Sequence, residues 1–306
     1  MHQPEIDEIK NNNPISFDHE WSIKNLSRSI QFKTISHPDY EKFDQAEFQS
    51  FLEWLEEEYR LIFEKLEKKY IGKSLLLKWE GEDLSLDPIL LTGHYDVVPV
   101  RANANEIWKE KPFSGKIDSD YVWGRGALDD KSGVIAIMEA VGYLIKNDFS
   151  PKRTVYLSFG HDEEIGGRRG AAKVTEYLIG KGINLEWTLD EGSFLLENII
   201  PGVDKAVAVI NVAEKGSLTI QVIGKSKGGH SSMPESNSSV GYLAEALIKL
   251  EENPLPGKLD GISLRLFDEV SKHMPFLYKI LFANLWLFEP LFNSSLSYTA
   301  SMNAVL

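Results

Sequence analysis

The sequence predicts an α/β sandwich whose core is a largely parallel sheet. Short apolar runs of strand type alternate with amphipathic segments of helical period along the first two thirds of the chain, the usual pattern of a parallel sheet with crossover helices. Acidic residues and histidines gather where several of these strands end. Because ligands of open α/β sheets bind beyond the carboxyl ends of the strands, we expect three distant segments to meet at one site.

The elements expected in the first part of the chain follow one another in a regular order. A helix is predicted where Phe48, Leu52 and Leu55 recur at helical spacing among Glu and Lys. Strands are predicted at apolar runs that end in Gly or in acids, and helices at the segments between them. In chain order the predicted elements are a helix over 46–70, strands over 74–78 and 87–92, a helix over 133–146, a strand over 154–159, a helix over 168–179 and a strand over 185–189.

The pattern changes after about residue 206, which predicts a second region built as a separate layer. Apolar and polar residues alternate there as in the strands of an exposed sheet. The predicted elements are strands over 206–212 and 217–222, a helix over 239–250 and a strand over 296–306. We therefore expect one domain over 1–210 and a second domain over 211–306.

Composition excludes several classes of function. Acidic residues outnumber basic ones, 46 to 33, for a net charge of -13, so a broad basic face for nucleic acid is not expected. The chain has no cysteine, so any metal must be held by His, Asp and Glu. The N-terminus lacks the pattern of a secretory signal, and the apolar stretch over 274–292 is interrupted by charges and proline. We expect a cytoplasmic protein that does not span or bind a membrane.

Two motifs place a histidine and acids near each other. His94 can ligate zinc through one ring nitrogen while Asp96 accepts the other N–H, although most such pairs are simply surface residues. The run GRGALDDKSG, over 124–133, directly precedes a predicted helix. It suits a tight turn that points a carboxylate, Asp129 or Asp130, into a site. It also suits an Asp that caps the helix, and the sequence leaves both readings open.

Three further motifs carry candidate groups. Asp162, Glu163 and Glu164 follow an apolar strand, where their mutual repulsion favours a bound cation; a solvated acidic turn is the alternative. One Glu could ligate a metal while its neighbour takes a proton from water, and His161 is expected to orient the turn. Asp190 and Glu191 follow another strand. His230 lies in a Gly-rich loop and either faces a substrate carbonyl or sits in an ordinary turn.

The order of these motifs is far more specific than any one of them. HxD, GRGAxDDKSG, DEExGG, DEG and KGGHSSMP together resemble the zinc metallopeptidase family of aminoacylase, carboxypeptidase S and dipeptidases, from about Trp21 onward. The phrases GHYDVVPV, PFSG and ANLWLFEPL look most like the carboxypeptidase S branch, which also holds N-acyl amino acid hydrolases. The resemblance implies a three-layer catalytic domain over 1–210 and an inserted, here incomplete, α+β lid and dimerisation domain over 211–306, with a possible homodimer.

The resemblance implies a hydrolase that cleaves amide bonds of peptides or N-acyl amino acids with metal-activated water. Two Zn²⁺ ions are implied for a complete site, with Co²⁺ or Mn²⁺ as alternatives. His94 resembles a ligand of the first zinc, and Asp129 resembles the bridging carboxylate, which Asp130 follows across a cis peptide bond. The other ligands implied are Glu164 for the second zinc and Glu191, or alternatively Asp190, for the first.

Three residues are implied to act on the reaction. Asp96 resembles the carboxylate that orients His94. Glu163 resembles the general base, and His230 resembles a lid histidine that stabilises the tetrahedral intermediate.

One ligand of the family pattern is missing from the chain. The second zinc of the family takes a further His that follows the lid, and none of the seven histidines of this chain has that place. They are His2, His19, His37, His94, His161, His230 and His273. We therefore expect a C-terminally truncated chain. The alternative function is a catalytically impaired metal-binding fragment or interaction partner.

Overall fold

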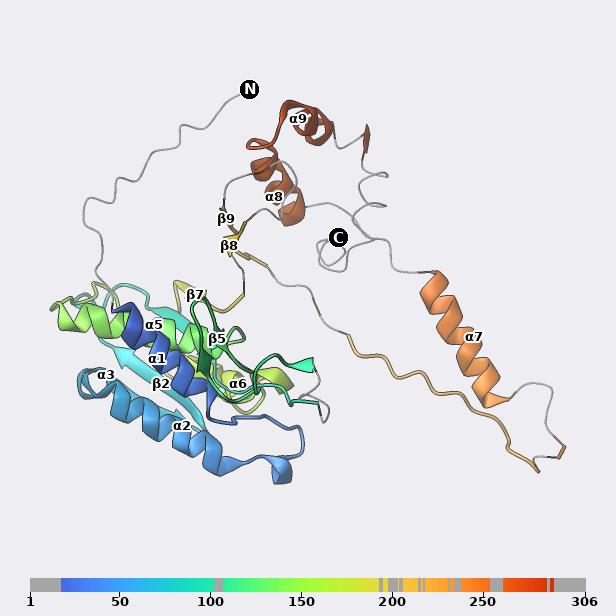
Figure 1. Ribbon diagram of the computed structural model, residues 1–306, viewed down its shortest axis with the longest axis horizontal. Helices are drawn as coiled ribbons and strands as arrows, with labels where there is room; N and C mark the ends of the chain where they lie inside the picture. Colours follow the sequence, from blue (N-terminus) through green and yellow to red (C-terminus); the bar gives the residue numbers. More distant parts are fainter. Residues whose placement is uncertain are drawn as a thin grey trace. The chain divides into compact units, whose positions relative to one another are not determined.

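The computed structural model describes the chain from residue 18 with several gaps. The described residues are 18–101, 107–192, 195–197, 203, 206–213, 216, 218–230, 232–233, 238–253, 261–284 and 287–288. Their contacts divide the chain into two compact units, one within 8–191 and the other formed mainly by 192–306 (Figure 1). The domain boundary expected at 210 stays a prediction.

A five-stranded mixed sheet organises the first unit. Its spatial order is β1-β2-β6-β3-β7, in which β6 pairs with β3 and β3 with β7 in parallel, whereas β1–β2 and β2–β6 are antiparallel. The strands are β1 (Glu67–Ile71), β2 (Ser74–Trp79), β3 (Ile89–His94), β6 (Val155–Gly160) and β7 (Trp187–Leu189). The predicted α/β class is confirmed, with a parallel core formed by β6, β3 and β7. The sheet is mixed rather than largely parallel, because β2 pairs antiparallel with β6 and the hairpin β1–β2 adds a second antiparallel pair.

The single long helix predicted over 46–70 is wrong in two respects: it divides at Tyr59 into two helices, and its last residues form a strand. The helix α2 (Gln45–Glu58) ends before Tyr59, whose φ of -105° and ψ of 36° are not helical, and the short α3 (Arg60–Lys65) follows. The remaining residues form β1, which is joined to β2 by a tight turn at Gly72 with a φ of 63°. Pairing along β2 therefore outweighs the helical pattern of these residues, and the glycine was the available signal.

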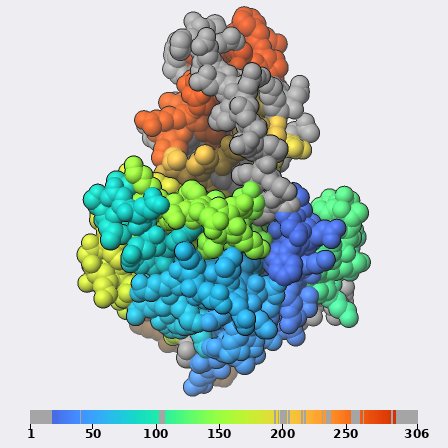
Figure 2. All heavy atoms as spheres, turned by 90° about the vertical axis from the view of Figure 1, so that its left-hand side faces the viewer, coloured from blue at the N-terminus to red at the C-terminus, as the bar shows by residue number. Residues whose placement is uncertain are grey.

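Helices cover both faces of the sheet. In β2, Leu75 and Leu77 point into a core shared with α2, α3 and α5 (Lys131–Lys146), whereas Leu76 points into a smaller core with α6 (Ala171–Gly180). The helix α1 (His19–Ile30), which the sequence did not predict, packs against α5. In Figure 2 the blue α2 and α3 lie beside the lime-green α5 on one face of this unit. The centre of the sheet is thus covered on both faces, and the histidines and acids of the candidate motifs lie at the ends of the strands.

Smaller elements complete the two units. A two-stranded sheet of β4 (Lys116–Ile117) and β5 (Val122–Trp123) belongs to the first unit, as does the 3-10 turn η2 (Glu163–Ile165). The second unit contains β8 (Leu195–Leu196), β9 (Val207–Ala208), α7 (Ser239–Glu252), α8 (Gly261–Ser271) and α9 (Phe276–Ala283).

Expectations for the second unit met different outcomes. The strand predicted over 206–212 is reduced to Val207–Ala208, and no strand forms at 218–222 in the part of the chain that the structure describes. The helix predicted over 239–250 is present as α7. The strand predicted over 296–306 lies outside the described residues. Among the described helices, none is both long and apolar enough to cross a membrane.

Candidate metal centre

His94 stands at the carboxyl end of the central strand. It is the last residue of β3, pairs with Gly160 of β6, and is only 2% exposed. Its Nδ1 lies 3.0 Å from the main-chain oxygen of Asp96 and 3.3 Å from Asp96 Oδ1. These contacts fix the ring and leave Nε2 directed away from Asp96, toward a group of acids.

Acidic side chains from three other segments surround Nε2 of His94. This atom lies 3.0 Å from Asp129 Oδ1, which belongs to the turn before α5, and 3.2 Å from Glu191 Oε2, beyond the end of β7. Glu163 Oε2, in η2 after β6, is 3.6 Å away. Two sets of possible ligand atoms are present, and within each set the atoms lie within 4.8 Å of one another. One set is His94 with Glu163 and Glu191, and the other is His94 with Asp129 and Glu164. Segments far apart in the sequence therefore meet at one edge of the sheet.

Asp96 holds two parts of the centre in place. It is fully buried, and besides its contact with His94 its Oδ1 accepts a hydrogen bond from the backbone N–H of Glu163 (3.1 Å). Its Oδ2 accepts another from the N–H of Glu164 (3.2 Å). The carboxylate thus ties the histidine to the acidic turn, a second contact that the sequence had not suggested.

The turn before α5 satisfies both readings that the sequence left open, one for each aspartate. Asp129 faces His94, whereas Asp130 caps α5 by accepting from the N–H of Gly133 (3.2 Å) and also accepts from the N–H of His94 (3.3 Å). The Asp129–Asp130 peptide bond is cis, as the family resemblance implies. The capping aspartate therefore joins this turn to the end of β3.

Lys131 is a buried residue of this turn that sequence reasoning missed. Its side chain is fully buried, and its Nζ donates to the carbonyl oxygens of Ser29 (2.8 Å) and Phe32 (2.7 Å). Burial lowers the pKa of Lys131 to about 7. The signal available in the sequence was a charged residue directly before the apolar run that forms the first turns of α5. Its contacts anchor the turn to the end of α1.

His161 supports the acidic turn from behind. It is buried, its Nδ1 lies 2.7 Å from Ser74 Oγ, and it belongs to neither set of ligand atoms. Asp162 is buried too, and its Oδ2 accepts from the N–H of Arg169 (2.7 Å). Gly170 packs directly against these groups and leaves no room for a side chain. A Cβ placed there would crowd Asp162 Oδ1 and lie 2.7 Å from Ser74 Oγ.

We expect Gly170→Ala to destabilise the protein by about 1–3 kcal/mol, the usual cost of forcing extra volume into a well-packed interior. Urea unfolding monitored by circular dichroism measures this change. Gly180→Ala is the matched control, because it lies at the other end of α6 with no atom near the added methyl group. Equal stability of the two variants would contradict the expectation.

Burial and crowding shift the proton affinities of the centre. Burial raises the pKa of Glu163 to about 7, with Glu191, Asp96 and Glu164 adding to the rise and His94 opposing it. Burial, followed by Glu191, also raises the pKa of Asp130 to about 7. Burial lowers the pKa of His94, but Asp96 and Glu191 more than offset this and raise it to about 12.

The donor set fits divalent metal ions. One imidazole nitrogen and four carboxylates, with no sulfur, are ligands that zinc, cobalt and manganese accept in proteins. Burial raises the pKa values of Glu163 and Asp130, neighbouring carboxylates add to the rise, and a bound cation would oppose both effects. The hydrogen-bonded carboxylate behind the imidazole is the partner that metal-binding histidines usually have.

The same shifts predict how stability depends on pH without metal. Glu163 and Asp130 have folded pKa values of about 7, above the ordinary values of 4.5 and 3.8 that these side chains have in an unfolded chain. Between roughly pH 4 and 7 the folded chain therefore keeps protons that the unfolded chain releases, so its stability falls as pH rises through this window. His94 acts in the same direction above pH 6.5, since its folded pKa is about 12.

We accordingly expect the Tm in the presence of a chelator to fall from pH 5 to pH 8, and excess Zn²⁺ to raise the Tm more at pH 8 than at pH 5. Glu163→Gln, which removes one of the titrating groups, should reduce the slope of the chelator series. Thermal unfolding by circular dichroism checks both points. A Tm that rises from pH 5 to pH 8 in the presence of the chelator would contradict the raised pKa values assigned to Glu163 and Asp130.

The two remaining candidate residues lie elsewhere. Asp190 is exposed, accepts from the N–H of Glu191 (2.9 Å) and lines a groove beside α6, and it is absent from both sets of ligand atoms. His230 belongs to the second unit, where it is exposed and its Nδ1 lies 2.8 Å from Ser232 Oγ.

Comparisons with known proteins agree with the geometry. The model of peptidase family M20/M25/M40 matches residues 90–279. The chain is 43% identical over 285 residues to "Probable carboxypeptidase S-like 2" of Dictyostelium discoideum, covering 92% of this chain and 54% of that protein. It is 36% identical over 288 residues to an N-fatty-acyl-amino acid synthase/hydrolase of Xenopus tropicalis, covering 93% of this chain and 56% of that protein.

The chain therefore spans about half the length of the curated relatives it matches. Among solved structures, an M20 family metallo-carboxypeptidase from Sulfolobus solfataricus is similar over 57% of this chain and 38% of that chain, with 23% identity and a TM-score of 0.44.

Proposed function

The chain belongs to peptidase family M20/M25/M40, and we propose that it hydrolyses amide bonds of peptides or N-acyl amino acids at the centre built around His94. The observation that supports this most is the convergence of Asp129, Glu191 and the η2 acids on one buried imidazole from separate segments. One of the two relatives is named a probable carboxypeptidase S-like protein and the other an N-fatty-acyl-amino acid synthase/hydrolase, and both names refer to enzymes that act on amide bonds.

Four residues would hold the metal ions in this proposal. His94, Asp129 and Glu191 would bind the first ion, and Asp129 with Glu164 would bind the second. Glu191 is preferred to Asp190 because its Oε2 lies 3.2 Å from His94 Nε2. Zinc is the proposed ion, with cobalt and manganese also compatible with these ligands. When bound, such ions would acidify water and polarise the carbonyl group next to the C–N bond that is cleaved.

The chain's own residues would then perform three tasks. Glu163 would accept a proton from the attacking water as the new C–O bond forms, and would return it to the leaving nitrogen as the C–N bond breaks. Burial raises its pKa in the metal-free chain, which makes this carboxylate a stronger base than an exposed one. Asp96 would hold His94 and the 163–164 turn in fixed positions relative to each other, through the contacts described above. His230, on the second unit, would stabilise the oxyanion of the tetrahedral intermediate.

The lid domain over 211–306, its role in a homodimer and the cytoplasmic location are parts of the same proposal. A lid that carried His230 to the substrate would make hydrolysis depend on the second unit. Light scattering of the purified chain tests whether it forms a homodimer, and a monodisperse monomer would contradict that part of the proposal.

A substrate panel tests the reaction. The purified chain, supplied with Zn²⁺, would be incubated with N-acetyl and long-chain N-acyl amino acids and with dipeptides, and the released amino group would be measured. We expect the release of amino groups to be abolished by a chelator and restored by Zn²⁺. Release that is the same with the chelator present, or no release from any substrate by a chain that binds Zn²⁺ tightly, would contradict it.

A further inference from the structure

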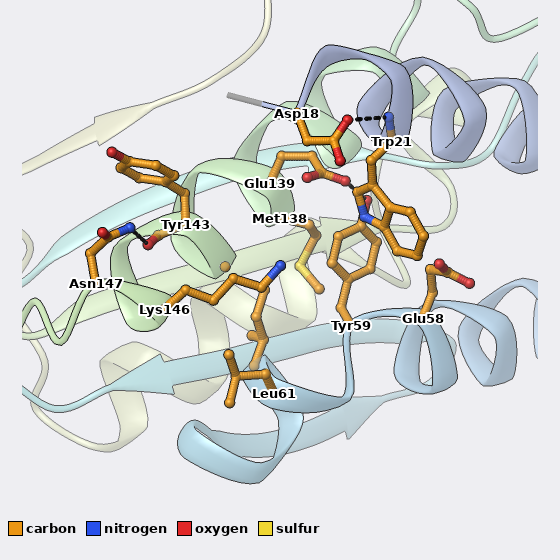
Figure 3. Close-up of a pocket in the computed structure, with 12 residues that line it drawn as sticks. Asp18, Trp21, Glu58, Tyr59, Leu61, Met138, Glu139, Tyr143, Lys146 and Asn147 are labelled. Carbon is orange, nitrogen blue, oxygen red and sulfur yellow. Dashed lines mark hydrogen bonds between the residues drawn. The ribbon is translucent and has the colours of Figure 1, made fainter. Parts of the chain in front are cut away.

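A second concave site lies at the opposite end of α5 from the metal centre. Its cavity of about 510 Å³ is formed between the start of α1, the junction of α2 and α3, and the last turns of α5 (Figure 3). The lining residues are Asp18, Trp21, Glu58, Tyr59, Leu61 and Ile62 together with Met138, Glu139, Gly142, Tyr143, Lys146 and Asn147. Since Asp130 caps the other end of α5, this cavity is separate from the candidate metal centre.

The lining combines negative charge with aromatic rings. Asp18, Glu58 and Glu139 contribute three carboxylates, against the one ammonium group of Lys146. Figure 3 draws Trp21, Tyr59 and Glu58 on one side of the cavity, and Lys146 between them and Tyr143. Carboxylates together with aromatic faces form the usual environment for an organic ammonium group, which is attracted to both.

The carboxylate of Glu139 is held in a fixed position. Its Oε1 accepts hydrogen bonds from the Tyr59 hydroxyl (2.7 Å) and from Asn25 Nδ2 (2.9 Å), and Asn25 also donates to Tyr59 (3.1 Å). Asn25 and Tyr59 are buried, at 5% and 7% exposure. A buried network of donors that end on one carboxylate orients it before any ligand arrives, and such preorganisation favours binding.

Gly142 keeps the floor of the cavity open. It lies within the helix α5, although glycine is a poor helix former. No neighbouring group is close enough to make a glycine necessary at this position. A Cβ at this position would meet only Ile62 Cδ1, at 3.7 Å, which is an ordinary contact. The glycine therefore leaves space beside Ile62 and does not serve a close approach of two backbones.

We propose that this cavity binds a small organic monocation, an ammonium group attached to an apolar body. The ammonium group would lie among Glu58, Glu139 and the ring of Trp21, and the apolar body would cover the floor at Gly142. Lys146 would repel a second positive charge, so a diamine of similar length should bind more weakly. Nothing in this inference requires the metal centre or the proposed hydrolysis.

Calorimetric titration of the full chain with phenethylammonium tests the inference. Phenethyl alcohol and phenylacetate serve as neutral and negative controls of nearly the same shape. We expect saturable binding of one phenethylammonium per chain, about tenfold or more tighter than either control, both with Zn²⁺ and with a chelator present. Binding that is no tighter than that of phenethyl alcohol would overturn the proposal.

Variants at Gly142 locate the binding. Gly142→Leu should abolish binding by filling the floor, whereas Gly142→Ala, which adds one methyl group in ordinary contact with Ile62, should retain most of it. Glu139→Gln should weaken binding about tenfold. Circular dichroism checks that each variant is folded. If Gly142→Leu binds as tightly as the wild type, the cation binds elsewhere and the proposal fails.

A second pair of variants keeps the test decisive if Gly142→Leu does not fold. Trp21 is 42% exposed and Glu58 half-buried, so Trp21→Leu and Glu58→Gln should leave the fold intact. Each should weaken phenethylammonium about fivefold to tenfold and leave phenethyl alcohol nearly unchanged. Unchanged affinity for phenethylammonium in both variants would also overturn the proposal.

Discussion

His94→Ala should lower the affinity for Zn²⁺ by more than about 100-fold and bring hydrolysis to background. Both sets of candidate ligand atoms contain this imidazole, so its removal disrupts both at once. Removing an outer partner of a metal ligand typically costs about 10- to 100-fold in affinity, and removing the ligand itself should cost more. Zinc titration by calorimetry measures the change.

Two comparison variants give this result its meaning. Asp96→Asn leaves the imidazole in place but weakens the contact that orients it, so we expect an intermediate loss of about 10- to 100-fold. His230→Ala should leave zinc affinity unchanged, since its proposed contact is with substrate. If His94→Ala bound zinc as tightly as the wild type, the centre around this residue would not be the metal site.

Glu163→Gln should reduce turnover by about 100- to 10,000-fold, the range that general base catalysis usually contributes. Glutamine has nearly the same shape and keeps the backbone N–H that donates to Asp96, but it cannot accept a proton. The affinity for zinc should change far less than turnover. Initial rates of amino acid release, measured beside a zinc titration, separate the two effects.

Glu164→Gln provides the reciprocal comparison. Its carboxylate belongs to the set with Asp129, so this variant should lose a metal ion first and activity as a consequence. Excess Zn²⁺ should then restore part of the activity of Glu164→Gln and none of that of Glu163→Gln. If the two variants showed the opposite pattern, Glu163 would be the metal ligand and Glu164 the general base. The structure permits this exchange, because Glu163 also forms a set of ligand atoms with His94 and Glu191.

The strand ends could be predicted from the sequence because each is marked by a change of residue type. An apolar run that stops at Gly93 and His94, or at Gly160 and the acids after it, shows both the strand and the place of its polar end. Parallel pairing of β3 with β6 and β7 then brings these ends to one edge of the sheet. The convergence of the acids on His94 follows from that topology.

Features that depend on contacts between distant residues could not be predicted in this way. The strand β1 looks helical in isolation, because its charged residues fit either period, and only pairing with β2 decides its form. Lys131 is buried because two carbonyl groups at the end of α1 accept its protons, and no local pattern shows them. The double role of Asp96 likewise depends on the backbone of a turn 67 and 68 residues away.

The pairing of His94 with Gly160 has a consequence for how this gene can change over evolution. Successive residues of a strand face opposite sides, so deleting one codon within 89–93 would shift the register and move the imidazole to the other face of the sheet. Exchanges among Leu, Ile and Val at the same positions leave that spacing intact. Selection should therefore tolerate changes of residue in this strand and reject changes of length. Insertions and deletions in descendants should collect instead in the connection over 80–88, which precedes the strand.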